Sequence, residues 1–248
     1  MRFESTVPKR KKKHKLKNGV LISLTFLLVL TGLLLIFSPM IEQQLIVHRA
    51  TKETATTAKQ MKENQKAKVS YDNNTVQPAS LTTLVENQIK NVSLPVIGLV
   101  SIPDLSVNLP IIKGDGYNTM LYGGGTMKPD EIMGQGNYAI ASHHVSNVMG
   151  SRYDGILFSP LQRARIGQKV YLTDKVKVYV YQIDKILKVL PNQGEVILDV
   201  PGQQLVTLVT CYSDDTYRLI VQGKLIKTQV YDNTTAALFD QKFNQYWK

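Results

Sequence analysis

The chain has 248 residues, of which 43% are hydrophobic, and a formal net charge of +11. This length and apolar content suffice for one sizeable folded core with attached segments. The first 17 residues hold eight Lys or Arg and one Glu, which leaves 22 basic and 18 acidic residues for the rest of the chain. A net charge of only +4 after the basic block argues against a nucleic-acid-binding protein.

An uncharged apolar segment, 19–41, follows the basic tail, 1–18. About 20 apolar residues in a helix span the ~30 Å hydrocarbon core of a bilayer. A cleaved signal peptide is the alternative, but its apolar region has only ~7–15 residues, and Ser38-Pro39-Met40 offers no small-x-small cleavage site. The pattern therefore predicts a single-pass membrane anchor, with a cytoplasmic N-terminus and everything from Glu42 onward outside the cell.

The next segment, 42–79, is rich in Lys, Thr, Gln and Asn. We find no apolar stripe that would bury a face, and such a composition predicts a polar stalk or linker that is partly helical or disordered. We expect the folded domain to occupy 80–248.

Short apolar runs broken by Pro and Gly dominate the folded domain, which predicts strands at 97–103 and 107–112. Two alternating runs, 169–172 and 176–189, surround a turn and predict a hairpin. Three helices are expected as well: behind a possible Ser80 cap (Leu81, Leu84, Val85, Ile89), from Ser159-Pro160 to Gly167, and at the C-terminus (Leu238, Phe239, Phe243, Tyr246). Many short strands with few helices predict a mainly β protein, a closed or nearly closed barrel.

The single cysteine, Cys211, ends an alternating apolar run, 205–211, and Arg218 follows seven residues later at the start of another. Extracytoplasmic proteins use cysteines in pairs, so one left over is a candidate reactive thiol. The alternative is an inert thiol that packs as a small hydrophobe. If the two runs form neighbouring strands, the guanidinium lies beside the thiol and can donate to a substrate carbonyl oxygen. The backbone N–H of Tyr212 is a second possible donor.

Histidine is the usual partner of a nucleophilic thiol. The chain has four histidines, and two of them lie in the basic tail and the stalk (His14 and His48). His143 and His144 remain, at the end of the apolar run 137–144, and are the candidates for acid–base chemistry.

The segment Thr207-Leu208-Val209-Thr210-Cys211 followed by Arg218, with Ala141-Ser142-His143 upstream, resembles the sortases. These transpeptidases anchor surface proteins to Gram-positive cell walls. The resemblance covers about 97–225 and is closest to class A, since the chain has an N-terminal anchor and no Asp-Pro pair such as class C lids use. It implies a sortase-type barrel.

The resemblance also implies the roles of the site residues. Cys211 would be the nucleophile, His143 the general acid and base, and Arg218 the group that holds the substrate and its oxyanion. Residues expected near the substrate are Thr210, Ala141, His144 and Tyr212. The groove for the first part of the substrate is expected to include the loop 191–201.

The implied reaction is cleavage of an LPxTG-type sorting signal between Thr and Gly through a thioester. The acyl group then passes to an amine of a lipid-linked peptidoglycan precursor, so the partners are surface proteins, the cell-wall precursor and the membrane. A non-catalytic, membrane-tethered binding module of the cell envelope is the alternative, but it requires the three residues to meet by chance. A papain-type peptidase is disfavoured because no C-G-S-C-W-like segment exists.

Some class A sortases bind Ca²⁺ through an acidic cluster before the catalytic histidine. The corresponding stretch here, 126–131, has one acidic pair beside a lysine. Calcium needs several oxygen ligands, so we expect no required metal and no cofactor. Zinc held by His143, His144 and Cys211 is formally possible, but adjacent histidines seldom both reach one ion.

Overall fold

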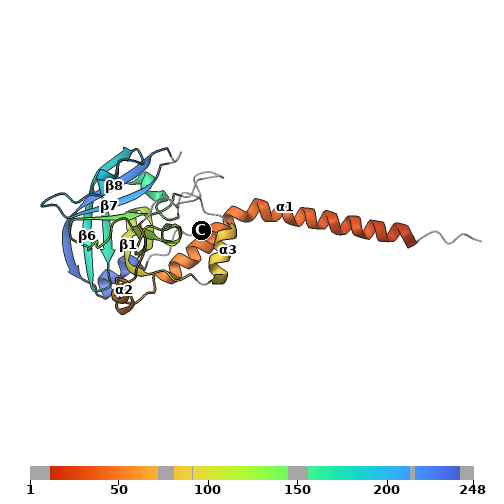
Figure 1. The fold of residues 1–248 in the computed structure, drawn as a ribbon, viewed down its shortest axis with the longest axis horizontal. Coiled ribbons are helices and arrows are strands. Elements are labelled where there is room, and N and C mark those ends of the chain that lie inside the picture. The colour runs from red at the N-terminus through yellow and green to blue at the C-terminus, as the bar shows by residue number, and fades with distance from the viewer. Residues whose placement is uncertain (1–11, 72–80, 91, 145–155, 213–215, 241–248) are drawn as a thin grey trace, which may run out of the picture. The chain divides into compact units, whose positions relative to one another are not determined.

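The computed structural model describes residues 12–71, 81–90, 92–144, 156–212 and 216–240. It divides into two compact units, 1–42 and 43–248, which are described separately. The first unit is the N-terminal part of the long helix α1 (Lys12–Glu53), and the second contains a β-barrel (Figure 1).

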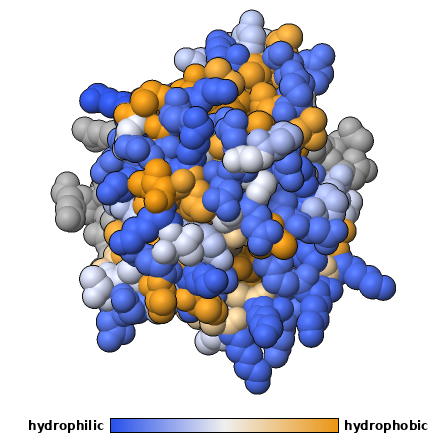
Figure 2. All heavy atoms as spheres, turned by 90° about the vertical axis from the view of Figure 1, so that its left-hand side faces the viewer, coloured by the Kyte–Doolittle hydropathy of each residue, from blue (hydrophilic) through white to orange (hydrophobic). Residues whose placement is uncertain are grey.

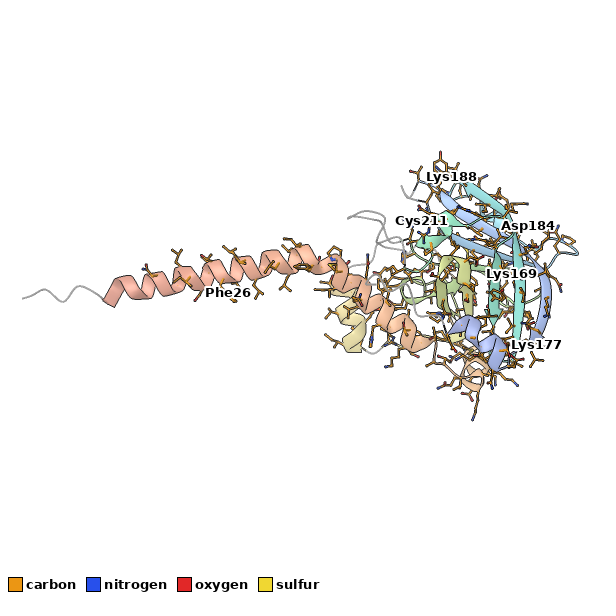
Figure 3. All side chains as sticks on the ribbon, turned by 180° about the vertical axis from the view of Figure 1, so that it is seen from behind. Phe26, Lys169, Lys177, Asp184, Lys188 and Cys211 are labelled. Atoms are coloured by element: carbon orange, nitrogen blue, oxygen red, sulfur yellow. The ribbon has the colours of Figure 1, made fainter. Side chains whose placement is uncertain are left out.

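Among the described residues, one helical stretch is long and apolar enough to cross a membrane, Asn18–Glu53, and it includes the expected span 19–41. Its side chains, Phe26 among them, project outward from the helix (Figure 3). The hydroxyls of Thr25 and Thr31 donate to carbonyl oxygens one turn earlier, at 2.9 Å and 2.8 Å. These hydroxyls are therefore satisfied within the helix, as a lipid environment requires. A signal sequence near an N-terminus also meets this criterion of length and composition, so the membrane crossing itself stays a prediction.

The second unit is built on eight strands within the described residues, closed in the order β1-β2-β3-β4-β7-β8-β6-β5. The strands are β1 (Val96–Ile102), β2 (Val107–Ile112), β3 (Gly124–Thr126), β4 (Asn137–Ala141), β5 (Lys169–Thr173), β6 (Lys177–Val189), β7 (Leu205–Cys211) and β8 (Arg218–Val230). The pairs β2–β3 and β4–β7 are parallel, and the other neighbours are antiparallel. The prediction of a closed, mainly β barrel is confirmed.

The helices and 3₁₀ turns of the second unit are short compared with α1 (Figure 1). They are α2 (Ala58–Asn64), α3 (Leu81–Lys90), η2 (Pro103–Leu105), α4 (Tyr117–Tyr122), η4 (Ser159–Arg163), η5 (Gly194–Ile197), α5 (Asn233–Ala236) and η6 (Ala237–Phe239).

Several local predictions hold in this unit. The expected hairpin is β5 and β6, where the Asp174 carboxylate accepts from the N–H groups of Val176 and Lys177 and Lys175 adopts φ 60°. The helix expected from Ser159 is a shorter 3₁₀ turn, η4, with proline in its first turn. The C-terminal segment forms only the short α5 and η6, and 241–248 lies outside the described residues, as does Ser80.

The prediction that 42–79 buries no face is wrong for its described part. Ile46 and Ala50 on α1 and Met61 on α2 are buried in the main core. Gln43 is buried as well, so positions 43, 46 and 50 form one helix face. The stripe is easily overlooked because it is short and includes a glutamine and an alanine.

Polar contacts tie this segment to the barrel as well. Asn64 donates from its side-chain amide to the Val96 carbonyl (2.8 Å), and the Lys175 ammonium donates to the Thr54 carbonyl (2.8 Å). Helix α2 packs against strand β1, which is buried along its whole length. The described residues 43–71 are therefore an integral layer of the folded unit, while the outer boundaries expected for the domains stay a prediction.

The face of the barrel shown in Figure 2 is largely hydrophilic, and its hydrophobic residues lie in separate groups. Two apolar clusters fill the second unit. The large one fills the barrel interior and extends to the helices packed on the barrel, and the small one, centred on Met120, Ala141, Val209 and Ile220, lies on the other side of β4, β7 and β8.

Candidate active site

The strand ladder places Cys211 and Arg218 side by side. Cys211 ends β7, Arg218 begins β8, and the two are direct partners in the antiparallel register. Directly opposite residues in such a pair point to the same face, with Cβ atoms ~4.5–5.5 Å apart. The expectation that the two runs are neighbouring strands is confirmed, and both residues are half-buried.

His143 comes to the same end of the barrel from the other side of β7. Strand β4 runs parallel to β7 with Ala141 paired to Val209, so His143 and Cys211 each lie two residues beyond this pair. The His143 N–H donates to the Met120 carbonyl (3.4 Å), and its carbonyl accepts from Phe158 N–H (3.3 Å). The ring of Tyr117 packs edge-on to the imidazole, with centroids 6.1 Å apart. Three adjacent strands thus present the three predicted catalytic residues together.

These three residues line one groove of about 400 Å³. Its floor is the small apolar cluster described above, and one wall is the segment from the end of β6 through η5. The lining residues are Met120, Met127, Ala141, Ser142, His143, Val189, Leu190, Pro191, Gln193, Gly194, Val196, Ile197, Val209, Thr210, Cys211, Arg218 and Ile220.

Of the four residues expected near the substrate, Ala141 and Thr210 line the groove. The hydroxyl oxygen of Thr210 is buried and has no hydrogen-bond partner among the described residues. His144 lies beside the groove rather than in its lining, where the Gln162 amide nitrogen is 3.5 Å from Nδ1 and 3.4 Å from Nε2 of the ring.

Tyr212 also lies outside the groove lining. Its backbone N–H, expected as an oxyanion donor, donates to the Tyr217 carbonyl at 2.9 Å. This hydrogen bond closes the loop between β7 and β8. The N–H already has an acceptor, so we assign it no part in the chemistry.

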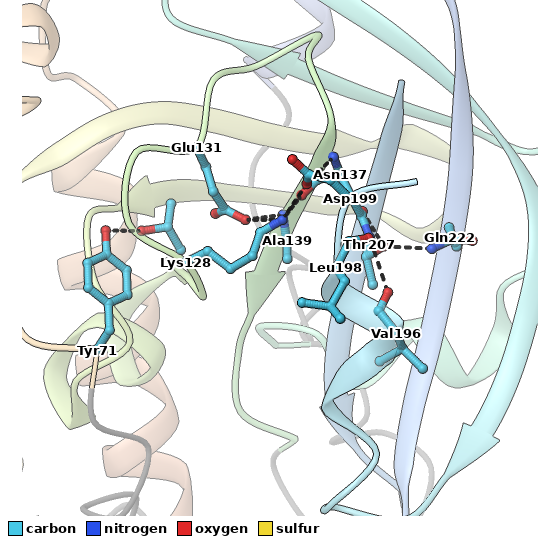
Figure 4. Close-up of polar contacts among 11 residues, drawn as sticks. Tyr71, Lys128, Glu131, Asn137, Ala139, Val196, Leu198, Asp199, Thr207 and Gln222 are labelled. Carbon is cyan, nitrogen blue, oxygen red and sulfur yellow. Dashed lines mark hydrogen bonds and ion pairs between the residues drawn. The ribbon is translucent and has the colours of Figure 1, made fainter. Parts of the chain in front are cut away.

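A polar network fixes the groove wall to the barrel (Figure 4). The buried Asn137 side-chain amide donates to the carbonyls of Val196 and Leu198, both at 3.1 Å. Its oxygen accepts from the Thr207 hydroxyl (2.6 Å), which in turn accepts from the Gln222 amide (2.9 Å). One asparagine at the start of β4 therefore holds the backbone of η5 in place.

The same network includes a lysine where a calcium ion would need oxygen atoms. Lys128 Nζ lies 2.7 Å from Asp199 Oδ1 and 3.8 Å from Glu131 Oε1, and it donates to the Asn137 carbonyl at 2.9 Å. The ammonium already supplies positive charge among these oxygens, so the residues present do not fit Ca²⁺. Burial raises the pKa of Glu131 to about 7, against the lowering effect of its hydrogen bond from Ala139 N–H and of the Lys128 charge.

The sequence did not indicate that Met120 and Asn137 belong to the site. It predicted the loop 191–201 as part of the groove, but not the residues that hold this loop in place. Met120 lies in α4, more than 20 residues before His143, and gives no motif. Asn137 opens an apolar run, where an asparagine offers no signal of its partners. Both become identifiable only when the strand order is known.

Comparisons with known proteins identify the family of this chain. A family model described as the sortase domain matches residues 100–226. Sortase A of Streptococcus agalactiae is 44% identical over 243 residues, which cover 95% of this chain and 98% of that protein. Sortase A of Listeria monocytogenes is 30% identical over 211 residues, covering 84% and 92%.

Solved structures give the same result for the barrel. The structure of Listeria monocytogenes sortase A is 31% identical, with a TM-score of 0.54, and the match covers 58% of this chain and 97% of that one. A sortase C from Streptococcus pneumoniae has a TM-score of 0.56 over 80% of this chain and 100% of its own. At 19% identity, the latter shows the shared fold alone.

Proposed function

Because the chain belongs to the sortase family, a family of cell-wall transpeptidases, we propose that it is a membrane-anchored cysteine transpeptidase acting on LPxTG-type sorting signals. The observation that supports this most directly is that His143, Cys211 and Arg218 line one largely apolar groove. Neither a metal nor a cofactor is part of the proposal.

In the first half-reaction, the Cys211 thiolate attacks the carbonyl carbon of the Thr–Gly peptide bond. A thioester forms between Sγ and the threonine acyl group, and the C–N bond breaks. His143 gives its proton to the departing glycine amine, which prevents the amine from leaving as an anion.

In the second half-reaction, an amine of the cell-wall precursor attacks the thioester. His143 takes the proton of this amine, the C–S bond breaks, and the thiolate of Cys211 is restored. Arg218 offers a planar set of donors to the carbonyl oxygen that gains charge in both steps.

The groove supports recognition of the apolar part of the sorting signal. Its floor and wall consist largely of aliphatic and methionine side chains, which suit a Leu-Pro segment. Thr210 lines the same groove next to Cys211, which supports the expectation that it lies near the bound substrate.

The proposed location is the cell membrane, crossed once by the apolar part of α1. The basic block before this apolar part favours a cytoplasmic N-terminus, since flanking segments rich in Lys and Arg stay on that side. The barrel would then face the cell wall, where surface proteins and the lipid-linked precursor meet it.

The decisive experiment is mass spectrometry of the full-length protein in detergent, incubated with an LPxTG peptide. The expected result is a covalent adduct in which the peptide fragment that ends in threonine is joined to Sγ of Cys211. This adduct should be absent in Cys211→Ala. The binding-module alternative predicts no adduct, together with slow reaction of Cys211 with a methanethiosulfonate reagent. Cleavage by the Cys211→Ala variant at an appreciable rate would refute the mechanism.

A further inference from the structure

An ammonium group lies between two aromatic rings directly behind the candidate catalytic residues. Lys188 Nζ is 4.2 Å from the ring centroid of Tyr212 and 4.0 Å from that of Tyr217. Tyr212 is the residue after Cys211, and Tyr217 is the residue before Arg218. One side chain on β6 therefore contacts both ends of the loop that joins nucleophile and guanidinium.

The strand register shows on which face this contact lies. Val189, Arg218 and Cys211 are in one row across β6, β8 and β7, and all three line the groove. Lys188 belongs to the next row, opposite Leu219. Leu219 packs in the barrel interior, whereas its neighbour Ile220 packs in the groove floor.

Side chains alternate between faces along a strand. Lys188 thus lies on the face opposite the groove, and none of the three clamp residues (Lys188, Tyr212, Tyr217) lines it. Figure 3 shows Lys188 and Cys211 at the same end of the barrel. The clamp can reach the reaction only through the backbone of the residues it holds.

The clamp contacts the two residues at which the loop begins and ends, Tyr212 directly after β7 and Tyr217 directly before β8. The Tyr212 N–H to Tyr217 carbonyl bond (2.9 Å) is the first interaction beyond the Cys211–Arg218 pair. A cation attracted to both ring faces holds the two rings at a fixed separation, and each such contact favours the closed arrangement by roughly twofold to fivefold at an exposed site.

We propose that Lys188 is a positioning residue, which fixes the loop ends and thereby the relative placement of Cys211 and Arg218. This inference rests on the proposed function, and it adds a residue that touches neither substrate nor reacting atoms. Removing the cation lets the two tyrosines separate, so the thiol and the guanidinium lose their common orientation.

The test uses the full-length protein in detergent with three substitutions. Lys188→Met keeps the length of the side chain and removes the charge, and Lys188→Arg keeps a cation that stacks on aromatic rings. Tyr217→Leu keeps the lysine charge and removes one ring. The control is Lys185→Met, the same exchange on the same strand, where the described residues record no ring contact.

Two measurements are made on each protein: steady-state cleavage of an LPxTG peptide, and the rate of Cys211 alkylation by iodoacetamide from pH 5 to 9. Lys188→Met should lower kcat about fivefold to thirtyfold with KM within twofold. Lys188→Arg should restore most of this loss, and Lys185→Met should match the wild type. The alkylation profile should move to higher pH in Lys188→Met and in Tyr217→Leu.

The outcomes separate the explanations. Equal behaviour of Lys188→Met and Lys185→Met in both measurements overturns the proposal. A shift in Lys188→Met without one in Tyr217→Leu overturns it in favour of a direct charge effect on the thiol. A loss of kcat that follows a lower melting temperature, without rescue by Lys188→Arg, shows a merely structural role.

Two further cases remain decisive. If Lys188→Met does not fold, Tyr217→Leu alone tests the clamp through the same kcat and alkylation readouts. If the wild type forms no thioester with the peptide, the proposed function fails, yet the alkylation profiles still decide whether Lys188 positions the thiol.

Discussion

Replacing Glu131 by Gln should remove a pH dependence from the stability of the barrel. Its side chain is only 4% exposed, and one oxygen accepts from the Ala139 N–H at 2.8 Å. The other oxygen, Oε2, is buried without a hydrogen-bond partner among the described residues. Glutamine keeps the acceptor and the shape but cannot ionise.

The magnitude follows from the pKa, which burial raises from 4.5 to about 7 in the folded protein. Between these values the folded state binds more protons than the unfolded state, so stability falls as pH rises. The stabilisation of the folded state by protonated Glu131 is fully present below pH 4.5 and is lost as pH rises through 7. With ~1.4 kcal/mol per pH unit, the whole effect is about 3 kcal/mol.

The assay is urea unfolding of both proteins at several pH values from 4.5 to 8, followed by circular dichroism. The free-energy difference between Glu131→Gln and wild type should move by about 3 kcal/mol in favour of the variant over this range. Glu86→Gln is the control and should show no such rise, because the hydrogen bond from Lys90 lowers the pKa of Glu86. A difference that stays flat with pH would refute a raised pKa at Glu131.

Four further outcomes are expected. His143→Ala should lower turnover ~10²–10⁴-fold, while His144→Ala keeps a measurable fraction; the reverse ranking would give His144 the catalytic role. Arg218→Lys should lose roughly 10²–10³-fold in turnover because a point charge replaces the planar donors, and near-normal kinetics would leave Arg218 without a geometric role. Deleting 43–79 from a soluble form should lower the unfolding free energy by about 3–6 kcal/mol, since two large apolar side chains leave the core; an unchanged urea midpoint would show that this packing adds nothing. Asn137→Ala should raise KM for the peptide more than it lowers kcat, because the groove wall loses two hydrogen bonds; equal effects on both would contradict that separation.

Local signals were sufficient for the hairpin β5–β6 and for the Cys211–Arg218 pair. In both cases the two strands are close in sequence, and a short connecting loop allows them to pair only in the antiparallel direction. The layer formed by 43–71 was missed for a physical reason. Its buried face uses few apolar residues on a segment whose other positions are polar, and an average over the segment hides such a face.

The sequence left His143 and His144 as candidates for acid–base chemistry, and only the family resemblance selected His143. The place of His143 beside Cys211 could not be derived from a local pattern. Its neighbour β7 lies more than 60 residues further along the chain and pairs with β4 in parallel, and no local pattern specifies such a pairing. The Lys128–Asp199 contact joins residues that are 71 positions apart, and it could not be predicted from the sequence for the same reason.

The structure holds the two halves of the site by different means. Cys211 and Arg218 are held by backbone pairing between adjacent strands, which the proposed Lys188 contact with two tyrosine rings reinforces, and His143 is held by backbone hydrogen bonds next to β4. The groove wall at η5 is instead fixed by side chains, chiefly Asn137 and Lys128. Backbone pairing tolerates most side-chain changes, whereas a side-chain bond is lost with a single substitution. A barrel of this kind can therefore alter the substrate it accepts by changing the residues that hold the wall, while its reacting groups stay in register.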